Sequence, residues 1–127
     1  RDTMTSTTDT RTDAHRYAET IADELVGVAA GRLEGYEPDD RVDALMTWMN
    51  DLGLDVEVTR NLTTGDLAAV DVLRTSGGPT CRVRFDAYDG VVVRVSWWGD
   101  RAEVTLPYVE GGDLADLMVD LMAEVAA

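Results

Sequence analysis

The sequence predicts an α+β fold of two layers, with helices on one face of an antiparallel meander sheet of four or five strands. Apolar residues recur at three- and four-residue intervals near both ends of the chain, and at two-residue intervals between residues 54 and 106. The alternating segments are joined by short turns, which favours antiparallel neighbours. The expected element order is therefore α-α-β-β-β-β-β-α.

One domain over residues 13–127 is expected, because the chain has 127 residues of which 45% are hydrophobic. Residues 1–12 are polar and rich in Thr, which is typical of a disordered lead. No basic stretch followed by an apolar one marks a secretory signal, and no apolar run of about 18 residues could span a bilayer. We therefore expect a cytoplasmic protein with no membrane partner.

The first helix is predicted over residues 13–34, with Asp13 as its N-terminal cap. Gly27 and Gly31 lie on one side of this helix, where the missing side chains would let another element approach closely. The apolar positions at helical spacing are Tyr17, Ile21, Leu25, Val28 and Leu33.

The second helix is predicted to start at Glu37-Pro38-Asp39-Asp40, because proline suits the first turn and carboxylates suit the positive end of the helix dipole. Gly53 is the predicted left-handed residue at its C-terminal end. Trp48 lies off the centre of the apolar stripe, so we expect it at the border of the core or in an interface. The stripe itself consists of Val42, Leu45, Met46, Met49 and Leu52.

From Leu54 onward the period is two, which predicts five strands. Residues 54–59 read as a half-buried strand, and residues 67–75, apolar on both faces, as a strand buried on most of both sides. Asp89-Gly90 and Gly99-Asp100 supply tight turns. The remaining strands are expected at 81–86, 91–98 and 101–106.

The last helix is predicted to open at Gly111-Gly112-Asp113. Asp116, Asp120 and Glu124 mark its solvent side. Its apolar stripe consists of Leu114, Leu117, Met118, Leu121, Met122 and Val125.

The composition is very acidic: 17 Asp and 8 Glu stand against 11 Arg, with no Lys, for a formal net charge of -14. Such self-repulsion is tolerable at high salt, where the Debye length falls to about 3 Å at 1 M. In composition the chain is similar to proteins of extremely halophilic archaea and their viruses. A high-GC bacterium or its phage would explain Arg in place of Lys but less of the acid excess. Residues 58–106 carry six acids and six arginines, so the flanking segments hold all of the net charge.

Few residues suit catalysis or metal binding. A single His and a single Cys are too few soft ligands for a zinc site, and one Cys excludes an internal disulfide. His15 is expected to be solvated in the first helical turn, and Cys81 to pack inward as an inert thiol with a raised pKa. Hydrolase and kinase motifs are absent, and the acidic stripes read as solvated helix faces. We expect no cofactor and no metal.

The candidate site is the outward face of the predicted strands. In one interpretation its arginines pair across strands with Glu57, Asp86 and Glu103. In the other, an Arg- and Trp-bearing face of balanced charge, with Tyr88 nearby, is a surface that a macromolecule can approach without strong repulsion. The candidate partner-binding residues are Arg82, Arg84, Val92, Arg94, Trp98 and Arg101.

The leading hypothesis is a non-enzymatic interaction or assembly module, most simply a homodimer, because isologous pairing needs only one patch. A nucleic-acid-binding domain using the same face is the second, although the total charge disfavours it. A small enzyme is the third, with Asp71 as the one candidate for a buried carboxylate.

Overall fold

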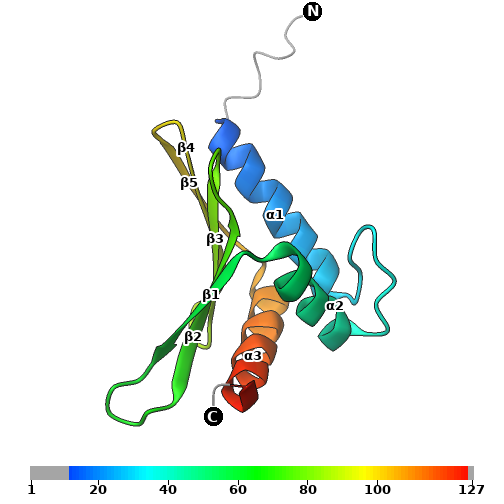
Figure 1. Ribbon diagram of the computed structural model, residues 1–127, viewed down its shortest axis with the longest axis vertical. Coiled ribbons are helices and arrows are strands. Elements are labelled where there is room, and N and C mark those ends of the chain that lie inside the picture. Colours follow the sequence, from blue (N-terminus) through cyan, green and yellow to red (C-terminus); the bar gives the residue numbers. More distant parts are fainter. Residues whose placement is uncertain (1–11, 126–127) are drawn as a thin grey trace, which may run out of the picture.

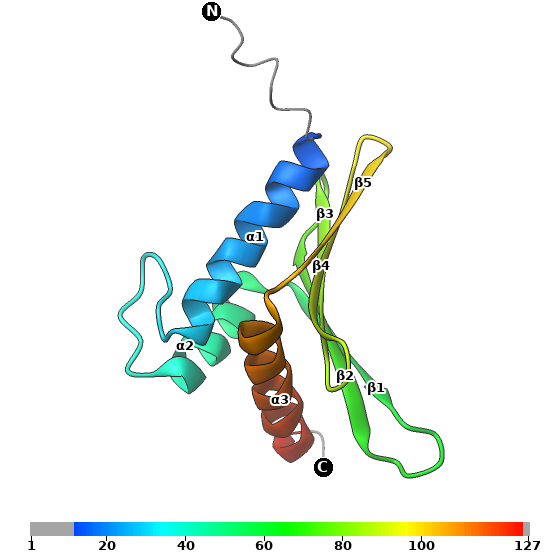
Figure 2. The ribbon, with the colours of Figure 1, turned by 180° about the vertical axis from the view of Figure 1, so that it is seen from behind.

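The computed structural model describes residues 12–125. Its five strands form one antiparallel sheet in the order β1-β2-β3-β4-β5, and the helices all lie on one side of it (Figure 1, Figure 2). The predicted two-layer α+β class and the order α-α-β-β-β-β-β-α are thereby confirmed, with five strands. The predicted disordered lead lies outside the described residues, except for Thr12.

The helices are α1 (Asp13–Ala29), α2 (Arg41–Thr47) and α3 (Tyr108–Val125), and α2 continues into a short π-helix, η2 (Trp48–Leu52). Each strand pairs with its neighbours in sequence, so the sheet is a simple meander. The segment 67–75 is a strand, as predicted. The strands are β1 (Asp55–Arg60), β2 (Leu67–Thr75), β3 (Thr80–Asp86), β4 (Gly90–Trp97) and β5 (Asp100–Thr105).

Helix α1 differs from the prediction at both ends. Its N-cap is Thr12, whose side chain accepts a hydrogen bond from the His15 backbone N–H, so Asp13 is the first helical residue rather than the cap. The helix ends at Ala29 instead of near Glu34. The reason is Gly31, whose φ of 79° lies in the left-handed region and cannot continue an α-helix.

The second helix is capped by Asp40, whose side chain accepts the N–H of Asp43, so it starts at Arg41 rather than at Glu37. The left-handed stop predicted at Gly53 is wrong, because its φ is -79°. A glycine is still required at position 53, because the backbone passes close to the preceding helical turn. A Cβ atom on Gly53 would lie only 2.5 Å from the Met49 carbonyl oxygen.

Helix α3 begins at Tyr108, directly after Pro107 and three residues before the predicted start. Gly111 therefore lies inside its first turns. A Cβ atom on Gly111 would lie 3.3 Å from the Leu106 Cβ and 3.4 Å from the Val91 backbone nitrogen. The missing side chain lets the start of α3 pack against β4.

The hydrophobic core lies between the helices and the sheet face turned toward them, here called the inner face. Helix α1 packs over β4 and β5, and α3 over β2, β3 and β4. Trp48, expected at the border of the core, is fully buried, with its ring edge-to-face against Phe85 at 5.7 Å between centroids. The inner face of the sheet contributes Val70, Val72, Cys81, Val83, Phe85, Val91, Val93 and Val95, all buried.

Strand β1 is exposed along its whole length, so the predicted half-burial is wrong. Val56 and Val58 are 37% and 42% exposed although their partners Val72 and Val70 are fully buried. The cause is the position of the helices, which pack on β2 to β5 and leave the β1 edge uncovered (Figure 1).

Candidate functional site

The outer face is the side of the sheet turned away from the helices. Pairing places Arg82 opposite Arg94 and Arg84 opposite Val92 on β3 and β4. Ser96 and Arg94 of β4 are opposite Arg101 and Glu103 of β5. Because directly paired residues point to the same face, all four predicted strand arginines lie on the outer face.

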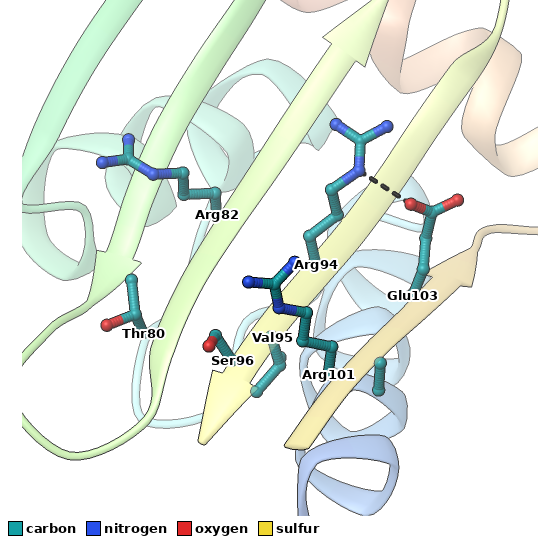
Figure 3. Close-up of a pocket in the computed structure, with 8 residues that line it drawn as sticks. Thr80, Arg82, Arg94, Val95, Ser96, Arg101 and Glu103 are labelled. Carbon is teal, nitrogen blue, oxygen red and sulfur yellow. Dashed lines mark hydrogen bonds and ion pairs between the residues drawn. The ribbon is translucent and has the colours of Figure 1, made fainter. Parts of the chain in front are cut away.

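A groove of about 450 Å³ crosses β3, β4 and β5 on this face (Figure 3). Arg101 extends from β5 across β4 toward Ser96 and Arg94. The Thr80 and Ser96 side chains, directly opposite one another, add two hydroxyl groups at one end. The full lining is Thr80, Arg82, Arg94, Val95, Ser96, Arg101, Ala102 and Glu103.

Most outer-face arginines pair with carboxylates of other strands, as one of the two interpretations predicted. Arg94 Nε donates to Glu103 Oε2 at 2.8 Å. Arg82 lies farther from its acid, with 3.7 Å between its Nη1 and Glu57 Oε1. These pairs are half-exposed, so each adds only a few tenths of a kcal/mol, about 0.2–1.

Arg84 has the tightest carboxylate contacts on this face. Its Nη1 donates to Asp71 Oδ2 at 2.6 Å, and its Nε lies 3.5 Å from Asp86 Oδ2. Its guanidinium is therefore already occupied within the chain.

The groove nevertheless has an excess of positive charge. Arg82 and Arg94 are like charges placed directly opposite each other, an arrangement that destabilises a sheet. Arg101 has no hydrogen bond or ion pair to its side chain from any residue between 12 and 125. Three guanidinium groups thus line the groove with one carboxylate, Glu103, in a chain whose net charge is -14.

The other candidate residues contribute less than predicted to the face. Val92 points outward but is only 9% exposed, because neighbouring side chains cover it. Trp98 is not in β4 as expected. It occupies the β4–β5 turn with φ 53°, is 91% exposed, and stands at the hairpin tip. Tyr88 is as exposed, but it belongs to the turn at the opposite end of β4.

A polar cluster on the inner side was not predicted from the sequence. Glu24 of α1 accepts a hydrogen bond from Trp48 Nε1 at 2.7 Å, and its two oxygens accept Nε and Nη2 of Arg74, both at 3.2 Å. Arg74 lies at an irregularity in the β2–β3 pairing. The cluster joins α1, η2 and β2. Its members are 24 and 50 residues apart in sequence, so no local pattern signals it.

Cys81 is fully buried beside this cluster. Burial raises the pKa of its thiol to about 11, and this effect exceeds the lowering by Arg74, while Glu24 raises the pKa further. At neutral pH the group is a protonated thiol, which agrees with the inert inward Cys that the sequence predicted.

The remaining candidates for chemistry have ordinary surroundings. The Asp71 side chain is 22% exposed and paired with Arg84, so it is not a buried, unpaired carboxylate. His15 Nε2 lies 3.8 Å from Glu19 Oε1 at the surface of α1. Within residues 12–125, no charged side chain is buried, and no three His, Cys, Asp or Glu side chains gather as a metal site would require.

Among the described helices, none combines the length and hydropathy needed to cross a membrane. Comparisons of the chain with protein-family models, with curated protein sequences and with solved structures found no match.

Proposed function

We propose that this protein is a non-enzymatic interaction module, an accessory protein that docks a partner protein through the outer face of its sheet. The observation that carries the proposal is the groove on β3 to β5, which Arg82, Arg94 and Arg101 line together with a single carboxylate, Glu103. Arg82 and Arg94 each have one acidic partner within the chain, but Arg101 has none among residues 12–125, although the chain has 25 acids.

The chemistry of the groove suits a protein partner. A guanidinium group forms paired, charge-assisted hydrogen bonds with carboxylates, and arginine is enriched in protein interfaces. Residues 107–127, which include helix α3 of the helical layer, carry five acids and no base, so that layer repels an acidic partner. The arginines of the outer face attract one instead. Docking there needs no change in the core, since the face lies opposite the helices (Figure 2).

The proposal includes the setting of the protein, the cytoplasm of a salt-loving host or a virus of such a host. The charge of -14 supports this, because molar salt removes the repulsion that would otherwise oppose folding. We expect the melting temperature to rise markedly between dilute buffer and molar KCl. Equal midpoints in the two would contradict the setting but leave the docking face unaffected.

Docking is tested by site-specific photo-crosslinking in cells. A photoreactive residue at Ser96 lies in the groove, and one at Asp120 lies on the exposed side of α3 as a matched control. We expect a discrete adduct from position 96 only, lost when Arg94 and Arg101 are both replaced by Glu. Absence of an adduct, or an adduct that survives the double replacement, would overturn the proposal.

Nucleic acid is the second candidate occupant, because the exposed indole of Trp98 lies on the same β4–β5 hairpin as Arg94 and Arg101, and aromatic rings next to arginines can stack bases. Phosphate binding is driven by counterion release and weakens steeply with salt. We therefore expect no retention of labelled single strands between about 0.1 M and 1 M KCl. If labelled strands are retained and Arg94→Glu abolishes the retention, the occupant of the face is nucleic acid and not a protein.

A further inference from the structure

The charges of the outer face are divided between its two sides. On β1 and β2 the outward charged residues are Asp55, Glu57 and Asp71, with no arginine. On β3 to β5 four arginines face outward with two carboxylates. One side of the face is therefore acidic and the other basic. The basic side consists of Arg82, Arg84, Arg94 and Arg101, with Asp86 and Glu103.

We propose that the occupant of the outer face is a second copy of this chain, in a dimer whose twofold axis runs parallel to the strands. In this dimer the acidic β1 side of each subunit lies over the arginine side of the other. The inference rests on the proposed docking function and names its partner.

The charge distribution selects this axis. Two packed sheets keep their strands within about 30° of alignment, and a twofold axis in the interface can run along the strands or across them. An axis along the strands exchanges the two edges, so that β1 lies over β4 and β5 of the partner. An axis across the strands sets β1 over β1, which opposes acid to acid and arginine to arginine.

Two side chains at opposite edges would gain partners in such a dimer. Asp55 of β1 and Arg101 of β5 are both exposed, and neither forms a side-chain hydrogen bond or ion pair within the described part of the chain. In the dimer Asp55 would lie over the side where arginines outnumber carboxylates, and Arg101 over the side whose outward charges are acidic. Two symmetric contacts between these edges would neutralise charges that the isolated subunit leaves unbalanced.

The middle of the face offers little exposed apolar surface. Ala69 and Val92, on outward positions of β2 and β4, are 0% and 9% exposed, and Leu73 is half-buried. Between them, the outward positions of β3 carry Arg82, Arg84 and Asp86. Charge therefore sets the orientation of the partner, as charged groups across an interface typically do.

The experiment measures the mass of the purified chain by analytical ultracentrifugation, in the lowest KCl concentration at which it is fully folded. The acidic side is reversed by Asp55→Arg with Glu57→Arg, and the basic side by Arg94→Glu with Arg101→Glu. We expect the wild type to be a dimer. Each double variant creates like-charge contacts twice by symmetry, so its dissociation constant should rise at least about 100-fold.

The decisive sample is the equimolar mixture of the two double variants. In a mixed dimer both reversed edges face complementary charges, so the mixture should regain the dimer mass although each variant alone is a monomer. The chain carrying all four substitutions should also dimerise. A matched control, Asp116→Arg with Asp120→Arg on α3, should leave the mass unchanged, since these residues lie on the helical layer.

Circular dichroism checks that every variant is folded, and the single substitutions Asp55→Arg and Arg101→Glu repeat the test without removing any pair within the chain. Dissociated variants that fail to reassociate when mixed would overturn the twofold arrangement. A dimer that neither double variant disturbs would also overturn it. If the wild type is a monomer while position 96 crosslinks to a protein of different mass, self-association is wrong and docking of another partner stands.

Discussion

The two faces of β3 and β4 are built from alternate residues of the same two strands, yet their environments are opposite. On the inner face Val83, Phe85 and Val93 are fully buried beneath the helices. On the outer face Arg82 and Arg94 are exposed and face each other. Core burial stabilises the fold mainly through the inner face, so the outer face can carry unfavourable like-charge neighbours.

Substitutions on the two faces of β3 should differ most in their effect on the free energy of unfolding. Phe85→Ala removes a ring that is fully buried against Trp48, and it should lower the free energy of unfolding by about 3–5 kcal/mol. Arg82→Ala, on the outer face of the same strand, should change it by less than about 1 kcal/mol. Chemical denaturation of both variants measures the contrast. Similar losses for the two would show that the outer face also contributes to the core.

The next effect concerns the polar cluster on the inner side. Glu24→Ala leaves Trp48 Nε1 and the Arg74 guanidinium without their acceptor and should cost about 2 kcal/mol. Glu24→Gln keeps an oxygen for the indole but loses the charge, so we expect about half of that cost. Denaturation curves distinguish the two variants. If Ala and Gln are equally harmless, the cluster does not hold α1 to the sheet.

Because burial on the inner face raises the pKa of the Cys81 thiol, this burial can be detected as a pH dependence of stability. Its pKa is about 11 in the folded chain against 9.0 without burial, so the folded state holds its proton more tightly. The stabilising effect is complete below pH 9.0 and is lost as the pH rises to about 11. Relative to Cys81→Ala, the wild type should lose about 2 kcal/mol of unfolding free energy across this interval. A constant difference would place the thiol in contact with solvent.

Trp98 should show a smaller effect of opposite sign. Its φ of 53° is unfavourable for a bulky side chain, and with 91% exposure the indole gains little from burial. Trp98→Gly should therefore stabilise the chain by about 1 kcal/mol, whereas Trp98→Ala keeps the Cβ and should be close to neutral. Thermal melting compares them. A loss of stability in the Gly variant would mean that the indole makes stabilising contacts.

The smallest effect is expected for the cross-strand pair of Arg94 and Glu103 on the outer face. A double-mutant cycle with Ala should give a coupling energy of about 0.3–0.5 kcal/mol, because both side chains are half-exposed. The coupling should decrease in 1 M KCl, where the Debye length is about 3 Å. A coupling above about 2 kcal/mol would show that the pair contributes strongly to stability and does not behave as a solvent-exposed ion pair.

Patterns within single elements were readable from the sequence. The period of two from Leu54 onward predicted the strands, and the turn residues Asp89-Gly90 and Gly99-Asp100 predicted two hairpins of the meander. The same alternation predicted that Arg82, Arg84, Arg94 and Arg101 share one face, because a strand turns successive side chains to opposite sides.

Helix boundaries were the weakest predictions. The α1 helix was expected to extend to Glu34, but the left-handed Gly31 ends it at Ala29. The α3 helix was expected to open at Gly111, but packing against β4 accepts a glycine within its first turns. In both cases a glycine can either end a helix or lie inside one at a close contact, and only the neighbours of the glycine in space decide between the two.

Burial was wrongly predicted where it depended on the position of another element. Trp48 lies off its helix stripe but is fully buried, because Glu24 and Phe85 approach it from α1 and β3. Val56 and Val58 alternate like core residues but are partly exposed, because no helix covers β1. The alternation identifies the side that a residue faces and not whether that side is covered.

By itself the sequence determined the element order, the pleat of each strand, the excess of acid and the face on which the strand arginines stand, because these follow from local periodicity and composition. The tertiary structure alone decided which part of the sheet is covered, that Glu24 joins Trp48 to Arg74, and that Arg82, Arg94 and Arg101 border one groove. Those features arise from contacts between residues distant in the chain, which no local pattern encodes.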